Sequence, residues 1–300
     1  MTSVTVKVPA KLNLQLSVGP RRADGYHDLV TVFHAVSLYD TITVAPSERD
    51  EITVTGEGAS AVPQDGDNLA LRAVAALREA LPGAVEPVRV TIAKRIPVAA
   101  GLAGGSADAA AALVACNALW DAGLSQQQLC AVAAEVGSDV AFAVLGGTAV
   151  GRGRGEDLTP ALVPNVQYHW VLAFADGQLA TPEVYATLDR LRPDWTAAPE
   201  PDTALMTALR AGDPVRVGKA LSNDLQPAAL TLFPALRKTL AAGTDLGALG
   251  ALVSGSGPTC LFLARNAARA LDLAAALSGA GVCRSVATVT GPVPGAGSVR

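Results

Sequence analysis

A turn of small residues between a strand and a helix limits the possible folds of this chain most. Residues 97–107 (PVAAGLAGGSA) follow a predicted strand at Val88–Ala93 and enter an alanine-rich stretch, Ser106–Trp120, which predicts a helix. Small residues let the backbone approach a ligand closely. The free N–H groups of the first helical turn and the positive end of the helix dipole are directed at the same place, where they favour an anion. This order indicates an anion site.

Two better-known phosphate-binding loops do not fit the segment. A P-loop requires a lysine after its last glycine, and no lysine follows Gly104 or Gly105. The dinucleotide fingerprint G-x-G-x-x-G is also missing from it. Taken alone, such a turn is more often only a turn, so the assignment depends on the rest of the chain.

Length and charge limit the class of protein. The chain has 300 residues, about twice a usual domain, so we expect two domains, 1–160 and 161–300. The net charge of −4 and the lack of a basic run argue against nucleic acid as the main ligand. No uninterrupted apolar stretch predicts a membrane span.

The spacing of the cysteines points to a reducing compartment, and the spacing of cysteines and histidines argues against a metal site. The four cysteines lie far apart without CxxC spacing, so we predict small core residues and a cytoplasmic location. No two histidines or cysteines have metal-ligand spacing, and we predict no metal site built by the protein. The sequence is compatible with a monomer or a dimer.

The hydrophobic pattern predicts a mixture of strands and helices. Val4–Val8 and Leu12–Val18 read as two neighbouring strands. Gly151–Gly155 (GRGRG) predicts a tight hairpin turn, and we prefer that interpretation to a binding role for its arginines. The other predicted strands are 31–36, 41–44, 52–55, 252–253, 260–263 and 285–290, and the other predicted helices are 69–81, 125–136, 203–211, 230–240 and 267–277.

Four segments in order resemble the GHMP kinase superfamily, which includes galactokinase, homoserine kinase and mevalonate kinase. They are Pro9–Leu14 (PAKLNL) with Arg21–Leu29 (RRADGYHDL), the turn of small residues, Gly137–Phe142 (GSDVAF) and Ser254–Thr259 (SGSGPT). The pairing of PAKLNL with DGYH is similar to the branch that acts on cytidine diphosphate methylerythritol. The chain departs from the family at Ala100 and Ala103, where glycine is usual, at Ala107-Asp108, which replaces Ser-Asn, and at Ala141, which replaces proline.

The resemblance implies a two-domain α+β fold, with an N-terminal domain like ribosomal protein S5 domain 2 and a ferredoxin-like C-terminal domain. It implies that the N-terminal domain binds ATP and that the second substrate lies in the cleft between the two domains. It implies ATP-dependent phosphorylation of the 2-hydroxyl of that small-molecule substrate, a step of the non-mevalonate isoprenoid pathway, with Mg²⁺ carried by ATP. The alternatives are another GHMP kinase, for homoserine, mevalonate or a sugar, and a non-catalytic nucleotide-binding protein.

By resemblance, Lys11 and Asp139 are the catalytic pair. Asp139 would accept or orient the proton of the substrate hydroxyl, and Lys11 would offset charge on the transferred group. The alternative for Asp139 is an ordinary acid at a helix N-terminus, and for Lys11 a solvated residue at a strand end.

Contacts to the substrate are also implied by the resemblance. Tyr26 would stack on the cytosine and His27 would hydrogen bond to its edge, with Tyr185 as a second ring or a core residue. Thr181 and Asn13 would contact the polar remainder of the substrate.

The remaining ligand contacts lie near the nucleotide. Lys94 matches a family lysine close to the nucleotide sites, although a charged strand end is an alternative. Asn68 resembles an adenine contact but could equally cap the following helix. The predicted ATP-binding residues are Asn68, Leu69, Pro97, Val98, Ala99, Ala100, Gly101, Leu102, Ala103, Gly104, Gly105, Ser106 and Ala107.

Overall fold

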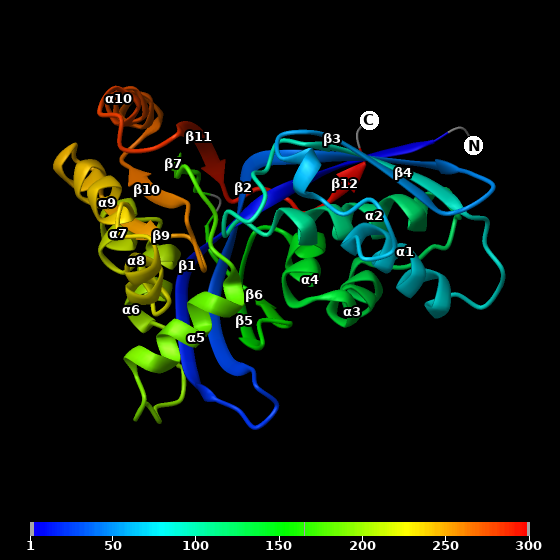
Figure 1. The fold of residues 1–300 in the computed structure, drawn as a ribbon, viewed down its shortest axis with the longest axis horizontal. Helices are drawn as coiled ribbons and strands as arrows, with labels where there is room; N and C mark the ends of the chain where they lie inside the picture. The colour runs from blue at the N-terminus through cyan, green and yellow to red at the C-terminus, as the bar shows by residue number, and fades with distance from the viewer. Residues whose placement is uncertain (1–2, 165, 299–300) are drawn as a thin grey trace.

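Two long strands organise the molecule. The computed structural model describes residues 3–164 and 166–298. In it, β1 (Val4–Arg21) and β2 (His27–Pro46) form an antiparallel hairpin. The hairpin starts near both termini and extends to the second half of the chain (Figure 1). It therefore carries side chains of the N-terminal segment into contact with both halves.

The sequence divided each of these strands in two, and this prediction was wrong. Pro9 has no N–H to donate and reads as a break, but it lies at a bulge where Pro9 faces Tyr39 and Ala10 faces Val36. The ladder resumes beyond the bulge because Leu12 and Leu14 are buried in the core. Burial on one face thus keeps each strand continuous through a local irregularity.

The first sheet has the order β12-β1-β2-β4-β3; in addition, β5 pairs with β2, β6 pairs with β5, and β8 pairs with β1. Its remaining strands are β3 (Glu51–Gly56), β4 (Val88–Lys94), β5 (Thr148–Gly153), β6 (Asp157–Pro160), β8 (Ser222–Asn223) and β12 (Gly297–Ser298). The 3₁₀ turn η1 (Ala59–Ala61) follows β3.

Four helices lie on one side of this sheet, where α2 and α4 contact its strands and α1 and α3 pack against these two helices (Figure 1). They are α1 (Leu69–Ala80), α2 (Gly104–Leu119), α3 (Gln126–Val136) and α4 (Ser138–Leu145). All the alanines of α2 except Ala118, near its C-terminal end, are buried, and their small side chains let the helix approach β1, β2 and α1 closely. Ser125 starts α3 through a reciprocal capping box with Gln128, which confirms its predicted cap.

The second half contains an antiparallel sheet of order β11-β7-β10-β9 with helices around it. Its strands are β7 (Tyr168–Phe174), β9 (Gly250–Val253), β10 (Cys260–Ala264) and β11 (Ser285–Gly291). Its helices are α5 (Thr181–Leu191), α6 (Thr203–Ala211), α7 (Pro214–Lys219), α8 (Gln226–Leu232), α9 (Leu236–Asp245) and α10 (Ala267–Gly279). The predicted α+β class is confirmed.

The prediction of a single helix over residues 230–240 was wrong. These residues belong to two helices, α8 and α9, because Pro234 cannot continue a helix and its ring restricts Phe233 to an extended conformation. The central strand β7 and the helix α5 were missed altogether.

The division of the chain at residue 160 stays a prediction. The short strands β8 and β12 follow that point in sequence but pair with β1 in the first sheet. No helix within residues 3–164 and 166–298 has the length and apolar content needed to cross a membrane.

Candidate functional site

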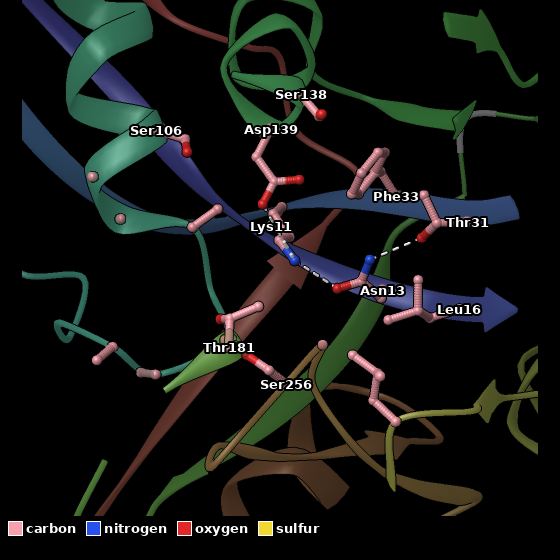
Figure 2. Close-up of a pocket in the computed structure, with 18 of the residues that line it drawn as sticks. Lys11, Asn13, Leu16, Thr31, Phe33, Ser106, Ser138, Asp139, Thr181 and Ser256 are labelled. Atoms are coloured by element: carbon pink, nitrogen blue, oxygen red, sulfur yellow. Dashed lines mark hydrogen bonds and ion pairs between the residues drawn. The ribbon is translucent and has the colours of Figure 1, made fainter. Parts of the chain in front are cut away.

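A cavity of about 550 Å³ lies where the two halves meet. β1 and β2 form one wall, and the turn of small residues with the first turns of α2 and α4 forms another. Thr181 and Tyr185 of α5 and the 255–256 backbone close it from the second half. Figure 2 shows Lys11, Asn13, Asp139 and Thr181 gathered around this space.

Lys11 and Asp139 meet in this cavity. Lys11 lies in the middle of β1 and Asp139 in the first turn of α4, with Lys11 Nζ and Asp139 Oδ2 separated by 3.8 Å. Lys11 Nζ also donates a hydrogen bond to Asn13 Oδ1 at 2.6 Å. Lys11 is only 8% exposed, so the alternative of a solvated strand-end lysine does not apply. Asp139 is a helix N-terminal acid, as the alternative held, and it also faces the lysine.

Asn13 is held in place by Thr31, a residue that sequence reasoning missed. Asn13 Nδ2 donates to Thr31 Oγ1 at 2.8 Å, and that hydroxyl donates to the carbonyl of Gln15 at 2.7 Å. This orientation leaves Asn13 Oδ1 to accept from Lys11. The side-chain network thereby fixes the ammonium beside Asp139 (Figure 2).

The turn of small residues contacts both halves of the molecule. Gly101 has φ of +75°, and a Cβ there would lie 2.1 Å from the carbonyl oxygen of Ser254. Ser254 Oγ in turn donates to the carbonyl of Gly101 at 3.1 Å. The backbone N–H of Lys11 donates to the carbonyl of Leu102 at 3.3 Å. Only glycine fits at position 101, and these contacts hold the turn beside Lys11.

The two alanines that depart from the family pattern differ in their backbone. Ala103 has φ of 57°, in the left-handed region that favours glycine, whereas Ala100 does not have a positive φ. The methyl group of Ala103 therefore carries a strain of about 1 kcal/mol, and that of Ala100 carries none. Both residues still line the cavity.

Most of the predicted ATP-binding residues are brought together. Those that line the main cavity are Leu69, Ala99, Ala100, Gly101, Ala103, Gly104, Gly105 and Ser106. Pro97 and Val98 line a smaller neighbouring cavity of about 240 Å³, to which Ala100 also contributes. Leu102 and Ala107 are buried in the core and support the turn from behind.

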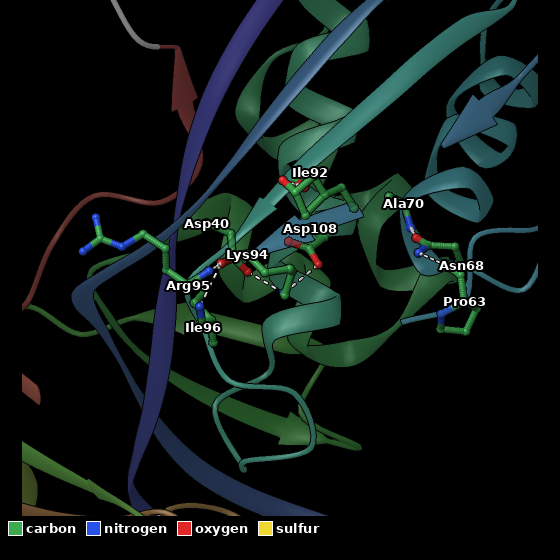
Figure 3. Close-up of polar contacts among 10 residues, drawn as sticks. Asp40, Pro63, Asn68, Ala70, Ile92, Lys94, Arg95, Ile96 and Asp108 are labelled. Carbon is green, nitrogen blue, oxygen red and sulfur yellow. Dashed lines mark hydrogen bonds and ion pairs between the residues drawn. The ribbon is translucent and has the colours of Figure 1, made fainter. Parts of the chain in front are cut away.

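Asn68 acts as a helix cap. Its Oδ1 accepts from the N–H of Ala70 at 2.8 Å, and its Nδ2 donates to the carbonyl of Pro63 at 2.7 Å (Figure 3). Asn68 is 5% exposed and lines neither cavity described above. Of the two interpretations left open by the sequence, the structure supports the cap.

Lys94, assigned to ligand binding from the resemblance, is not brought into the cavity. Its Nζ donates to Asp40 Oδ2 and, at 2.8 Å, to Asp108 Oδ2, and the residue is 3% exposed (Figure 3). Asp40 Oδ1 also accepts from the backbone N–H groups of Arg95 and Ile96. The ion-pair cluster therefore anchors the end of β4 immediately before the turn of small residues.

Burial alone would lower the pKa of Lys94, but the carboxylates of Asp108 and Asp40 together raise it above its usual value. Burial raises the pKa of Asp108 well above its usual range, and Lys94 only partly opposes this. These neighbouring carboxylates therefore stabilise the protonated form of Lys94, whose role is structural.

A second cavity of about 650 Å³ adjoins the first and is lined by Tyr26, His27 and Tyr185. His27 Nε2 lies 2.8 Å from Asp189 Oδ1, and the centroids of the His27 and Tyr185 rings are 5.1 Å apart. Tyr26 is 57% exposed at the end of the Asp24 turn, where its ring can receive a flat ligand.

Thr181 also borders this second cavity, and its Oγ1 lies 2.9 Å from Ser256 Oγ. Sequence reasoning missed Phe33, Ser138, Arg154 and Asp189 at these two cavities. Arg154 was visible in the GRGRG segment, but a hairpin turn explained that segment sufficiently. Ser138 lies within the quoted Gly137–Phe142 segment but was given no role there, whereas Phe33 and Asp189 carry no signal of their own in a single sequence.

The chain is similar to known proteins over nearly its whole length. Residues 68–147 match the family model for the GHMP kinases N terminal domain, and residues 205–283 match that for the GHMP kinases C terminal. The 4-diphosphocytidyl-2-C-methyl-D-erythritol kinase of Thermobifida fusca is 57% identical over 305 residues, covering 98% of each chain. That of Mycolicibacterium smegmatis is 55% identical over 300 residues, covering 98% of this chain and 92% of the relative.

Solved structures show the same relationship. The crystal structure of a 4-(cytidine 5'-diphospho)-2C-methyl-D-erythritol kinase is 37% identical, with a TM-score of 0.76 over 95% of this chain and 98% of the other. A homoserine kinase from Cytophaga hutchinsonii, 19% identical, superposes with a TM-score of 0.78 over 100% of this chain and 98% of its own. The second likeness shows a shared fold alone.

Proposed function

Since this chain belongs to the GHMP kinase family, and within it to the 4-diphosphocytidyl-2-C-methyl-D-erythritol kinases, we propose that Lys11 and Asp139 carry out its phosphoryl transfer. ATP is the phosphoryl donor, and the acceptor is the 2-hydroxyl of 4-diphosphocytidyl-2-C-methyl-D-erythritol, in the non-mevalonate isoprenoid pathway. We place the reaction in the cytoplasm on the basis of cysteine usage.

The triphosphate of ATP lies along the turn of small residues. Gly104 and Gly105 begin α2, so their N–H groups have no partner within the helix and face the cavity. Ser106 adds a hydroxyl at the same place. Among the described residues that line this cavity, Asp139 is the only carboxylate. Mg²⁺ would therefore arrive with ATP, held mainly by phosphate oxygens and water, and would offset the negative charge of the triphosphate.

Asp139 receives the proton of the acceptor hydroxyl during transfer. The new bond joins the hydroxyl oxygen to the γ-phosphorus, while the bond from that phosphorus to the bridging oxygen breaks and ADP leaves. Lys11, 3.8 Å from the carboxylate, offsets the negative charge of the transferred group. Asn13 and Thr181 hold the methylerythritol part of the substrate within the same cavity.

The cytidine of the acceptor occupies the second cavity. Tyr26 provides an aromatic face, and His27 provides a ring nitrogen oriented by Asp189. Tyr185 lines both cavities and lies beside His27. The observation that carries the proposal is this connection: an aromatic pocket opens directly into the cavity that contains Lys11 and Asp139.

An acceptor panel tests the proposed function. We expect ATP consumption by the wild-type chain with the cytidine diphosphate substrate, and less than about a hundredth of that rate with homoserine or mevalonate, because neither fills the aromatic pocket. ADP formation coupled to a colour reaction measures it, with substrate-free enzyme as the background. Comparable turnover of homoserine or mevalonate would instead favour another kinase of the family.

A further inference from the structure

Arg154 lies where the two cavities join. The residues that line both of them are Leu29, Ser138, Arg154, Thr181 and Tyr185. Arg154 is the one cation in that shared set. The other cations at the cavities lie to either side, with Lys11 lining only the first cavity and Arg21 and Arg72 lining only the second.

The hairpin between β5 and β6 fixes the position of Arg154. Its neighbours Gly153 and Gly155 have φ of +70° and +107°, so the turn has the conformation expected from the GRGRG sequence. The backbone N–H of Arg154 donates to Glu156 Oε2 at 2.6 Å, and its Nε lies 3.6 Å from Glu156 Oε1. The guanidinium carbon lies 5.3 Å from the centre of the Tyr26 ring.

The terminal nitrogens of this guanidinium are available to a ligand. Within residues 3–164 and 166–298 they have no hydrogen-bond partner, and the shortest contact between the guanidinium and Glu156 is made at Nε. The side chain is 45% exposed. A guanidinium presents its two terminal N–H groups in a planar fork that matches two oxygens of a phosphate.

We propose that Arg154 binds the diphosphate of the acceptor substrate. This inference rests on the proposed function, since it takes the cytosine to lie in the Tyr26 cavity and the reacting hydroxyl to lie at Asp139. The diphosphate connects those two ends of the molecule, so it must cross the junction where Arg154 lies. Arg154 is then a specificity residue that favours cytidine diphosphate compounds over uncharged nucleosides.

Calorimetric titration with cytidine, cytidine monophosphate and cytidine diphosphate tests this role without any need for turnover. We expect Arg154→Gln to lower the affinity for cytidine diphosphate about 10-fold. The affinity for the monophosphate should fall less, and that for cytidine by less than about 2-fold. Arg154→Lys should recover part of the loss because it keeps the charge but not the fork. The KM for ATP should stay unchanged in both variants.

Arg152→Gln is the matched control, because Arg152 is an exposed arginine of the same hairpin that lines neither cavity. It should bind all three ligands as the wild type does. Equal weakening of cytidine and cytidine diphosphate by Arg154→Gln would show that Arg154 acts through Tyr26, and this outcome overturns the inference. Unchanged affinity for cytidine diphosphate, or an equal rise in the KM for ATP, overturns it as well. Failure of the wild type to turn over the cytidine diphosphate substrate counts against the proposed function instead.

Discussion

Replacing Asp139 by Asn is expected to lower kcat by about 100- to 10,000-fold, the range attributed to a positioned acid or base. Asparagine keeps the size and hydrogen-bonding reach of the side chain at the start of α4, so the cavity is preserved. The amide, however, cannot take the proton of the acceptor hydroxyl. The KM values for both substrates should therefore change by less than about 3-fold, because the lost interaction is made in the transition state.

Steady-state kinetics with both substrates measure this effect. Asp157→Asn is the control, since Asp157 is an exposed acid on β6 that lines neither cavity. The double variant Asp139→Asn/Lys11→Met should have a kcat scarcely lower than that of Asp139→Asn alone, because the effects of replacing residues that act as a unit are not additive. Retention of more than about a tenth of wild-type kcat by Asp139→Asn would be incompatible with proton transfer to Asp139.

Replacing Lys94 by Met is expected to lower the free energy of unfolding by about 3–5 kcal/mol, because it leaves buried carboxylates without their cation. Asp40 and Asp108 are 0% and 2% exposed, so solvent cannot replace the ammonium. Denaturant unfolding at neutral pH measures the loss. Lys7→Met, at an exposed position of β1, should cost less than about 0.5 kcal/mol.

The pH dependence separates lost charge from lost packing. Burial already raises the pKa of Asp108 in the wild type, and loss of Lys94, which opposes this effect, raises it further above the ordinary aspartate value of about 3.9. The folded variant then binds more protons than the unfolded chain, so its stability rises as pH falls. Its deficit against the wild type should shrink between about pH 7 and about pH 5. Lys94→Met/Asp108→Asn should also recover part of the deficit, and a deficit unaffected by either change would point to packing alone.

The sequence predicted most of the site because its residues lie in short, ordered motifs. The turn of small residues, Lys11 and Asp139 could all be named from segments of six to eleven letters. That these segments meet could not be derived from spacing, since Lys11 and Asp139 are separated by most of the first half. It followed only from the resemblance, and the long β1–β2 hairpin and α4 supply the physical cause.

The errors came from tertiary effects that no local pattern contains. Lys94 sits at a strand end, which normally implies a solvated or ligand-bound charge, but the carboxylates that bury it come from β2 and α2. Arg154 belongs to a turn whose sequence needed no further explanation, and only the convergence of two cavities gives it a possible ligand. Pro9 reads as a break, but the buried residues on either side of it keep β1 continuous.

A crystal structure with a non-hydrolysable ATP analogue and the cytidine diphosphate substrate tests the arrangement of the site most directly. We expect the γ-phosphate to lie between the N–H groups of Gly104 and Gly105 and the substrate 2-hydroxyl, with that hydroxyl within about 3.2 Å of an Asp139 oxygen. A triphosphate bound away from residues 99–106, or a hydroxyl directed away from Asp139, would contradict it.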